Sequence, residues 1–234
     1  MKLINIINNY CEVGATPRFY LKADTALLRN NDAFYIPDSL GRIVAAPHIV
    51  LKVSRLAKCI GERFAPRCID ADMGGVVFTA IDRLEELKRE ALPWDEAVGY
   101  DHSSALSLES LGRDAMLEGA TFLINDSEVA HIKLSDMRFS PDKIISYLSE
   151  NMTLRIGDLI YLGSPQQFDI KAGDNLKLRI GDKTLLNFDV KLSVLRSGLI
   201  FMDKWDEWDR WGRRDSEFKE LKELREIREA LSNK

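Results

Sequence analysis

The chain has 234 residues, 45% of them hydrophobic, and its 33 basic and 37 acidic side chains give a formal net charge of −4. A chain of this length can form one sizeable domain with an appendage and can bury a core without disulfides or metals. The charge balance excludes the basic surface that nucleic acid requires. No run of about 18 apolar residues is present, so we expect no membrane contact either.

Short segments rich in β-branched and aromatic residues predict strands through most of the chain. In chain order these segments are 3–7, 18–23, 43–53, 75–81, 158–163, 175–180 and 184–190. Helices are predicted at 82–92, where leucines recur at helical spacing before Pro93, and at 140–152, where Ser140 can cap and Pro141 can begin the helix. We therefore expect an α+β fold with a rolled or sandwiched mixed sheet and few short helices.

The segment 192–234 is dense in charge and is predicted to be a C-terminal extension. Its apolar residues recur every three or four positions, which predicts an amphipathic helix over about 215–231; they are Phe218, Leu221, Leu224, Ile227 and Leu231. A helix of this length is marginal alone and needs a surface to pack against. That surface is either the chain's own domain or dimer mate, or a separate protein partner.

Five segments in order carry a resemblance to a known family. They are RFYLKADTALL (18–28), FTAIDRLEELKREALPWDEAVGYD (78–101), INDSEVAH (124–131), MTLRIGDLIYLGSP (152–165) and AGDNLKLRI (172–180). Their order and spacing resemble the fumarylacetoacetate hydrolase family. The resemblance implies a mixed β-sandwich or β-roll over 1–191, with 1–40 as an N-terminal part that includes a lid region and 41–191 as the core.

The resemblance also implies a specific chemistry. In that family Mg²⁺ or Mn²⁺ is held by a Glu-x-Glu pair on one strand and an Asp on a later strand, because hard cations prefer charged oxygen ligands. The metal chelates a dicarbonyl or oxo-acid substrate and stabilises the enolate formed when a carbon–carbon bond breaks. A lysine holds the substrate, and in many members a lid histidine activates water.

The metal-binding carboxylates are absent from the corresponding positions of this chain. Counting back from ERFAPR (62–67) places the Glu-x-Glu pair at Ala46 and His48, and counting back from Asp82 places the metal-binding Asp at Val77. We therefore expect no metal cofactor at these positions.

Two further details of this alignment matter. An alternative register, anchored on residues 59–61, places the Glu-x-Glu pair at Val53 and Arg55, which are not carboxylates either. The family lysine falls at Val98 and the lid histidine near Val13. No catalytic residue of the family type is therefore expected.

His48 has two interpretations. It is either one ligand of a changed metal site or a hydrogen-bonded histidine in a vacated pocket. On an extended strand Ala46, His48 and Val50 share one face, and that face offers no second ligand. We favour the hydrogen-bonded histidine.

Other reactive side chains give weaker signals. Asp101 and His102 would face opposite sides of a strand and so could not form a dyad. Cys11 has no neighbouring base that would make it a nucleophile.

Several positions keep the residue types of the resembled family. They are the candidates for binding a small anion together with His48, although packing and turn geometry also favour them: Lys22, Asp24, Gly163, Ser164 and Pro165.

These observations predict a catalytically inactive homologue that binds a partner protein or a small oxo-acid. The alternative is an active hydrolase, decarboxylase or isomerase of a dicarbonyl or oxo-acid substrate with a rearranged site. The resemblance implies a homodimer. Three cysteines without metal-site spacing and the lack of a signal-like start indicate a cytoplasmic location.

Overall fold

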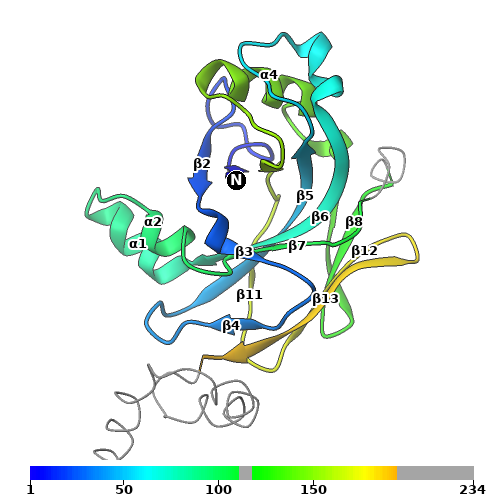
Figure 1. Cartoon of the computed structure of the whole chain (residues 1–234). Helices are drawn as coiled ribbons and strands as arrows, with labels where there is room; N and C mark the ends of the chain where they lie inside the picture. The colour runs from blue at the N-terminus through cyan, green and yellow to red at the C-terminus, as the bar shows by residue number, and fades with distance from the viewer. Residues whose placement is uncertain (111–117, 194–234) are drawn as a thin grey trace, which may run out of the picture. The chain divides into compact units, whose positions relative to one another are not determined.

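A computed structural model of the protein describes residues 1–110 and 118–193, and the predicted helix at 215–231 lies outside this part of the chain. The described residues form two mixed sheets (Figure 1). The larger, eight-stranded sheet has the order β2-β1-β10-β5-β6-β7-β3, and β11 also pairs with β5. Its strands are β1 Leu3–Ile6, β2 Phe19–Lys22, β3 Leu27–Leu28, β5 Ile43–Val53, β6 Ile69–Ala80, β7 Ser104–Leu106, β10 Leu159–Tyr161 and β11 Phe168–Asp169.

The smaller sheet contains five strands in the order β4-β13-β12-β8-β9. Its strands are β4 Phe34–Ile36, β8 Ala120–Ile124, β9 Ser127–Ile132, β12 Asn175–Ile180 and β13 Lys183–Leu192. Strands β8 and β9 were not predicted. They are joined by Asn125 and Asp126, which both have positive φ, the conformation that a tight hairpin turn requires.

The helices are short, as expected. Within residues 1–110 and 118–193 they are α1 Ile81–Arg89, α2 Asp95–Val98, α4 Pro141–Asn151 and the 3₁₀ turns Asp24–Ala26, Glu62–Cys68 and Leu134–Asp136. Ser140 caps α4 by accepting a hydrogen bond from the Lys143 amide at 3.2 Å, as its sequence predicts. Helix α1 ends three residues before the predicted end, because Ala91 adopts a positive φ and the Leu92 amide bonds back to the Leu87 carbonyl.

Two predicted strands need correction. The strand predicted at 75–81 begins at Ile69, because β6 pairs with β5 along its whole length. Asp101 and His102 do not lie on a strand: they are exposed and form a turn before β7, and His102 has a φ of 61°. Their side chains therefore cannot be assigned to the two faces of a strand.

The two faces of the large sheet contribute to separate hydrophobic clusters. Ile49 and Phe78 belong to the main core, together with residues of the smaller sheet, whereas Val50, Val77 and Tyr161 belong to a second cluster on the opposite face. We call the face with Val50, Val77 and Tyr161 the inner face. The Tyr161 hydroxyl donates to the Ala105 carbonyl at 3.3 Å, so a side chain of β10 reaches β7, which is three places away in the sheet. The large sheet is therefore curled around its inner face.

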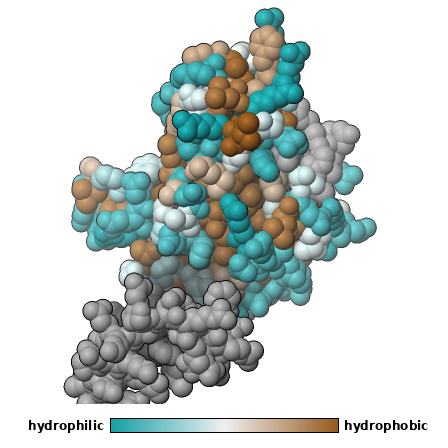
Figure 2. All heavy atoms as spheres, viewed as in Figure 1, coloured by the Kyte–Doolittle hydropathy of each residue, from teal (hydrophilic) through white to brown (hydrophobic). Residues whose placement is uncertain are grey.

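The face of the molecule drawn in Figure 2 is mostly hydrophilic. In the view of Figure 2 the apolar side chains gather above the centre, near α4 and the N-terminal loops of Figure 1, with hydrophilic side chains around them. None of the described helices combines the length and the apolar character that a membrane crossing needs.

Candidate functional site

Strands β5 and β6 bring the three expected metal positions together on the inner face. Ala46 lies directly opposite Val77 in the antiparallel ladder, and His48 lies opposite Gly75. Residues directly opposite each other in a ladder project from the same face. The alternative register is less consistent with this geometry, because Val53 is the last residue of β5 and Arg55 lies beyond it.

His48 is buried and hydrogen-bonded. Its Nδ1 lies 3.1 Å from the amide nitrogen of Gly163, which donates the hydrogen bond. Because Nδ1 is the acceptor, the neutral ring carries its proton on Nε2. Burial, with a smaller contribution from Lys22, lowers the pKa of His48 from 6.5 to about 3. The imidazole is therefore neutral at physiological pH, and it meets the Tyr161 ring edge-on with the ring centroids 5.7 Å apart.

Gly163 must be glycine for this contact. Its φ of 106° is rarely adopted by residues with a side chain, and a Cβ there would lie 3.2 Å from the Ile6 carbonyl oxygen. The turn after β10 is thereby held close enough for its amide to reach His48.

Lys22 lies at the end of β2, and 4% of it is exposed. Its Nζ donates to the Ser103 carbonyl at 2.7 Å and to the Ser103 hydroxyl at 3.1 Å, which links β2 to the start of β7. Burial lowers the pKa of this amine well below its ordinary value. Lys22 is also close enough to His48 to affect that imidazole electrostatically.

Two further polar side chains of the inner face have no hydrogen-bond partner among the described residues. Both amide atoms of Asn5 and the hydroxyl of Ser104 are unpartnered, although the two residues are 1% and 0% exposed. An unsatisfied buried polar group costs about 1–3 kcal/mol. Such groups are expected where a ligand completes the hydrogen bonding.

The strand register places these groups on one face. Lys22 is paired with Leu3, so Lys22, Leu3 and Asn5 share a face. Asn5 is paired with Tyr161, and Tyr161 with Val50, which shares its face of β5 with His48. At the far end of the sheet, Val77 is paired with Ser104. Neither Asn5 nor Ser104 was predicted from the sequence. The one local sign at Asn5 is that it is the single polar residue in the apolar run 3–6.

The structure brings together only some of the residues predicted to bind a ligand. Lys22, His48 and Gly163 meet at the inner face, but Asp24 and Pro165 are exposed. The Ser164 hydroxyl donates to the Gln166 carbonyl within its own turn.

The two positions expected for the family's catalytic side chains differ in their exposure to solvent. Val13, in the predicted lid region, is 68% exposed, whereas Val98 at the end of α2 is buried. The Val98 carbonyl accepts a hydrogen bond from the Ser103 hydroxyl at 3.0 Å. Val98 is thus connected to Lys22 through Ser103.

The residues at the expected metal positions do not fit Mg²⁺ or Mn²⁺. Ala46 and Val77 have no donor atom, and Nδ1 of His48 is already bonded to Gly163. Hard divalent cations require several oxygen ligands in a well-defined geometry. Residues 1–110 and 118–193 contain no cluster of three or more His, Cys, Asp or Glu side chains that is suited to a metal ion.

The Tyr161 ring occupies space on the inner face that is free because Gly75 has no side chain. A Cβ on Gly75 would lie 2.7 Å from Cε1 of Tyr161 and 2.6 Å from Cγ2 of Val50. Glycine at position 75 therefore makes room for the tyrosine ring.

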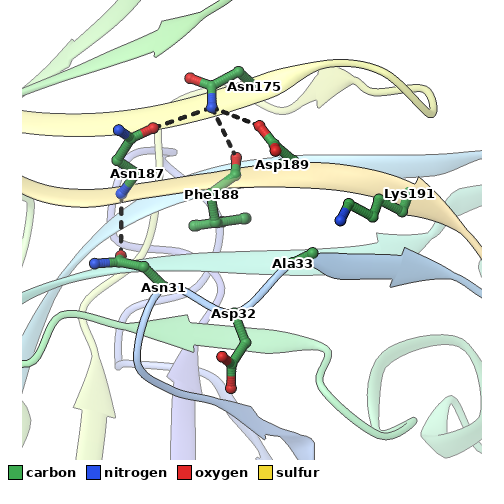
Figure 3. Close-up of a pocket in the computed structure, with 8 residues that line it drawn as sticks. All are labelled: Asn31, Asp32, Ala33, Asn175, Asn187, Phe188, Asp189 and Lys191. Carbon is green, nitrogen blue, oxygen red and sulfur yellow. Dashed lines mark hydrogen bonds between the residues drawn. The ribbon is translucent and has the colours of Figure 1, made fainter. Parts of the chain in front are cut away.

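A separate cleft of about 410 Å³ lies on the smaller sheet (Figure 3). Its lining is polar: Asn31, Asp32, Ala33, Asn175, Asn187, Phe188, Asp189 and Lys191. Nδ2 of Asn175 donates to Asn187 at 3.0 Å and to Asp189 at 2.9 Å, and the Asn187 amide donates to Asn31 at 3.1 Å. Several of these groups bond to one another, although Oδ1 of Asn175 is buried without a partner among the described residues.

Comparisons with known proteins agree with this fold. The model of the fumarylacetoacetate (FAA) hydrolase C-terminal family matches residues 7–191. The chain is 28% identical to the mitochondrial oxaloacetate tautomerase FAHD1 of Arabidopsis thaliana, over 76% of this chain and 82% of that protein. It is 22% identical to the oxaloacetate tautomerase YcgM of Escherichia coli, over 79% of this chain and 90% of that protein.

Solved structures show the same fold. One is a fumarylpyruvate hydrolase from Pseudomonas aeruginosa in complex with Mn²⁺ and pyruvate, with a TM-score of 0.75, 18% identity, and coverage of 82% of this chain and 90% of that chain. Another is a 2-hydroxyhepta-2,4-diene-1,7-dioate isomerase from Mycobacterium marinum, with a TM-score of 0.73, 23% identity, and coverage of 82% and 75%.

Proposed function

The chain belongs to the fumarylacetoacetate hydrolase family, and we propose that it binds small oxo-acids at the inner face without a metal and has lost the family's metal-dependent carbon–carbon bond cleavage. The observation that supports this proposal is that Ala46, His48 and Val77, where the resemblance places the family's carboxylates, share one face with Lys22 and include no carboxylate. This face offers hydrogen-bond donors in place of anionic ligands.

The donors suit an anion. The Nε2–H of His48 is a donor, Asn5 and Ser104 carry unpartnered groups that can donate, and the amine of Lys22 lies on the same face. A carboxylate accepts several hydrogen bonds, and those from charged or buried donors are the stronger ones. An oxo-acid would therefore satisfy groups that are unsatisfied in the free protein.

The relatives suggest the probes. The Pseudomonas aeruginosa structure is a complex with Mn²⁺ and pyruvate, and the two tautomerase relatives are named for oxaloacetate. Both compounds combine a carboxylate with an adjacent ketone, which matches a face with several donors and few acceptors. Pyruvate is the smaller and chemically more stable probe.

The test is calorimetric titration of the metal-stripped protein with pyruvate in EDTA. We expect saturable binding that Lys22→Met reduces at least tenfold and that Lys171→Met, at an exposed lysine, leaves unchanged. Binding that appears only after Mn²⁺ is added would contradict the proposal. So would equal affinity in the two lysine variants.

A second candidate function is an active tautomerase with a rearranged site. Its support is that curated relatives are named oxaloacetate tautomerases, and that keto–enol exchange requires only proton transfer. Ultraviolet absorbance of the oxaloacetate enol tests it directly. Acceleration in EDTA by the wild type and not by Lys22→Met would favour the active enzyme over a binding protein.

The assembly of the chain is also a proposal. We propose a cytoplasmic homodimer formed by residues 1–191, with the C-terminal extension 192–234 contacting its own chain, its mate or another protein. Light scattering of the full chain and of a chain truncated after Ser193 tests whether the dimer depends on that extension. A monomer at micromolar concentration in both would contradict the dimer.

A further inference from the structure

The hydrogen bonds of Lys22 match a neutral amine. Among the described residues, Nζ donates two hydrogen bonds, and both acceptors belong to Ser103. The Ser103 hydroxyl uses its own hydrogen to bond the Val98 carbonyl, so toward Lys22 it can only accept. A neutral amine has two N–H groups and one lone pair, whereas an ammonium has a third N–H that would need a partner.

The surroundings of Nζ favour the same state. A buried ammonium is costly unless it is paired with an anion. Among the described residues, Lys22 bonds to Ser103, which is neutral, and interacts with His48, whose imidazole is neutral because its pKa is also lowered. These surroundings favour the neutral, nucleophilic amine over the ammonium.

We propose that Lys22 is a carbonyl-reactive amine that forms a reversible imine with a 2-oxo acid bound at the inner face. This inference rests on the proposed oxo-acid binding and adds covalent chemistry to it. The lone pair of Nζ attacks the keto carbon, and a proton moves from nitrogen to the former keto oxygen, which gives a carbinolamine. Loss of that hydroxyl and the remaining amine proton as water gives the C=N bond, so an amine and a ketone yield an imine and one water.

The neighbouring donors can hold such an adduct. The Nε2–H of His48 and the unpartnered groups of Asn5 and Ser104 share the face with Lys22, and each can donate to the carboxylate or to the departing oxygen. Burial also limits competition from water, which hydrolyses imines.

The experiment is borohydride trapping. The full chain is incubated with pyruvate in EDTA, reduced with sodium cyanoborohydride, digested and mapped by mass spectrometry. We expect one carboxyethyl group on the peptide that contains Lys22, at least tenfold above any other lysine peptide. Lys171→Met should give the same adduct, and Lys22→Met should give none.

The wild-type peptide map keeps the test decisive even if Lys22→Met does not fold, because the map locates the adduct without any variant. Urea-unfolded wild type serves as the control for ordinary lysine reactivity, and its adducts should be spread over many lysines. Calorimetric binding of pyruvate without an adduct at Lys22 would overturn the imine while leaving oxo-acid binding intact. The absence of both binding and adduct would overturn both proposals.

Discussion

The pH dependence of stability is a direct consequence of the buried imidazole. His48 has a pKa of about 3 in the folded chain and 6.5 as its ordinary value. Between these values the unfolded chain binds a proton at His48 that the folded chain does not bind. The stability from this residue is therefore fully present above pH 6.5 and is lost as the pH falls toward 3.

The size of the effect follows from the same two values. Each pH unit below 6.5 costs about 1.4 kcal/mol, so at pH 5 the folded state loses about 2 kcal/mol relative to pH 8. For a domain of this size that corresponds to a fall in melting temperature of about 4–8 °C. Burial is the main cause of the lowered pKa of His48, and Lys22 contributes less.

The substitution His48→Asn isolates the contribution of His48 to the pH dependence of stability. An asparagine side-chain oxygen can accept from the Gly163 amide but does not titrate. Urea unfolding of the wild type and the variant at pH 8 and pH 5 gives the comparison, in which the other ionisable groups largely cancel. We expect the wild type to lose about 2 kcal/mol more than the variant. Equal losses would refute the assignment of His48 as a neutral buried acceptor.

Two other substitutions test the packing and polarity of the inner face. Gly75→Ala should destabilise the fold by about 1–3 kcal/mol in urea unfolding, because its Cβ would lie within 2.7 Å of both Val50 and Tyr161, whereas Gly61→Ala, with nothing within 4 Å, should change stability by less than about 0.5 kcal/mol. Similar effects at the two glycines would contradict the tight packing of Tyr161. Asn5→Leu should raise stability by about 1 kcal/mol, because it removes two unpartnered buried atoms, and should weaken pyruvate binding. A loss of stability would show that Asn5 has a structural partner.

The sequence predicts much of the large sheet because its strands are strongly patterned. The strand 43–53 matches β5 at both ends, and the Ser-Pro start of α4 is local chemistry that the structure reproduces. Ala46 and Val77, where spacing places two of the family's carboxylates, lie opposite each other in the ladder. That they are the family's metal positions stays a prediction.

Other parts of the site depend on contacts that the sequence does not encode locally. The hydrogen bond from Gly163 to His48 joins residues 115 positions apart, and the bond from Lys22 to Ser103 joins residues 81 apart. The burial of Asn5 and Ser104 on the inner face results from pairing with distant strands, so the sequence alone does not predict it. The turn at Asp101 and His102 was not predicted, because the positive φ of a non-glycine residue such as His102 is not evident from the sequence.

Metal dependence of ligand binding tests the central claim most directly. Pyruvate should be titrated by calorimetry into metal-stripped protein in EDTA and into the same protein with excess Mn²⁺, after a titration of Mn²⁺ alone. We expect no saturable Mn²⁺ binding, and we expect the same pyruvate affinity, within about twofold, under both conditions. A stoichiometric Mn²⁺ site that strengthens pyruvate binding by tenfold or more would contradict it.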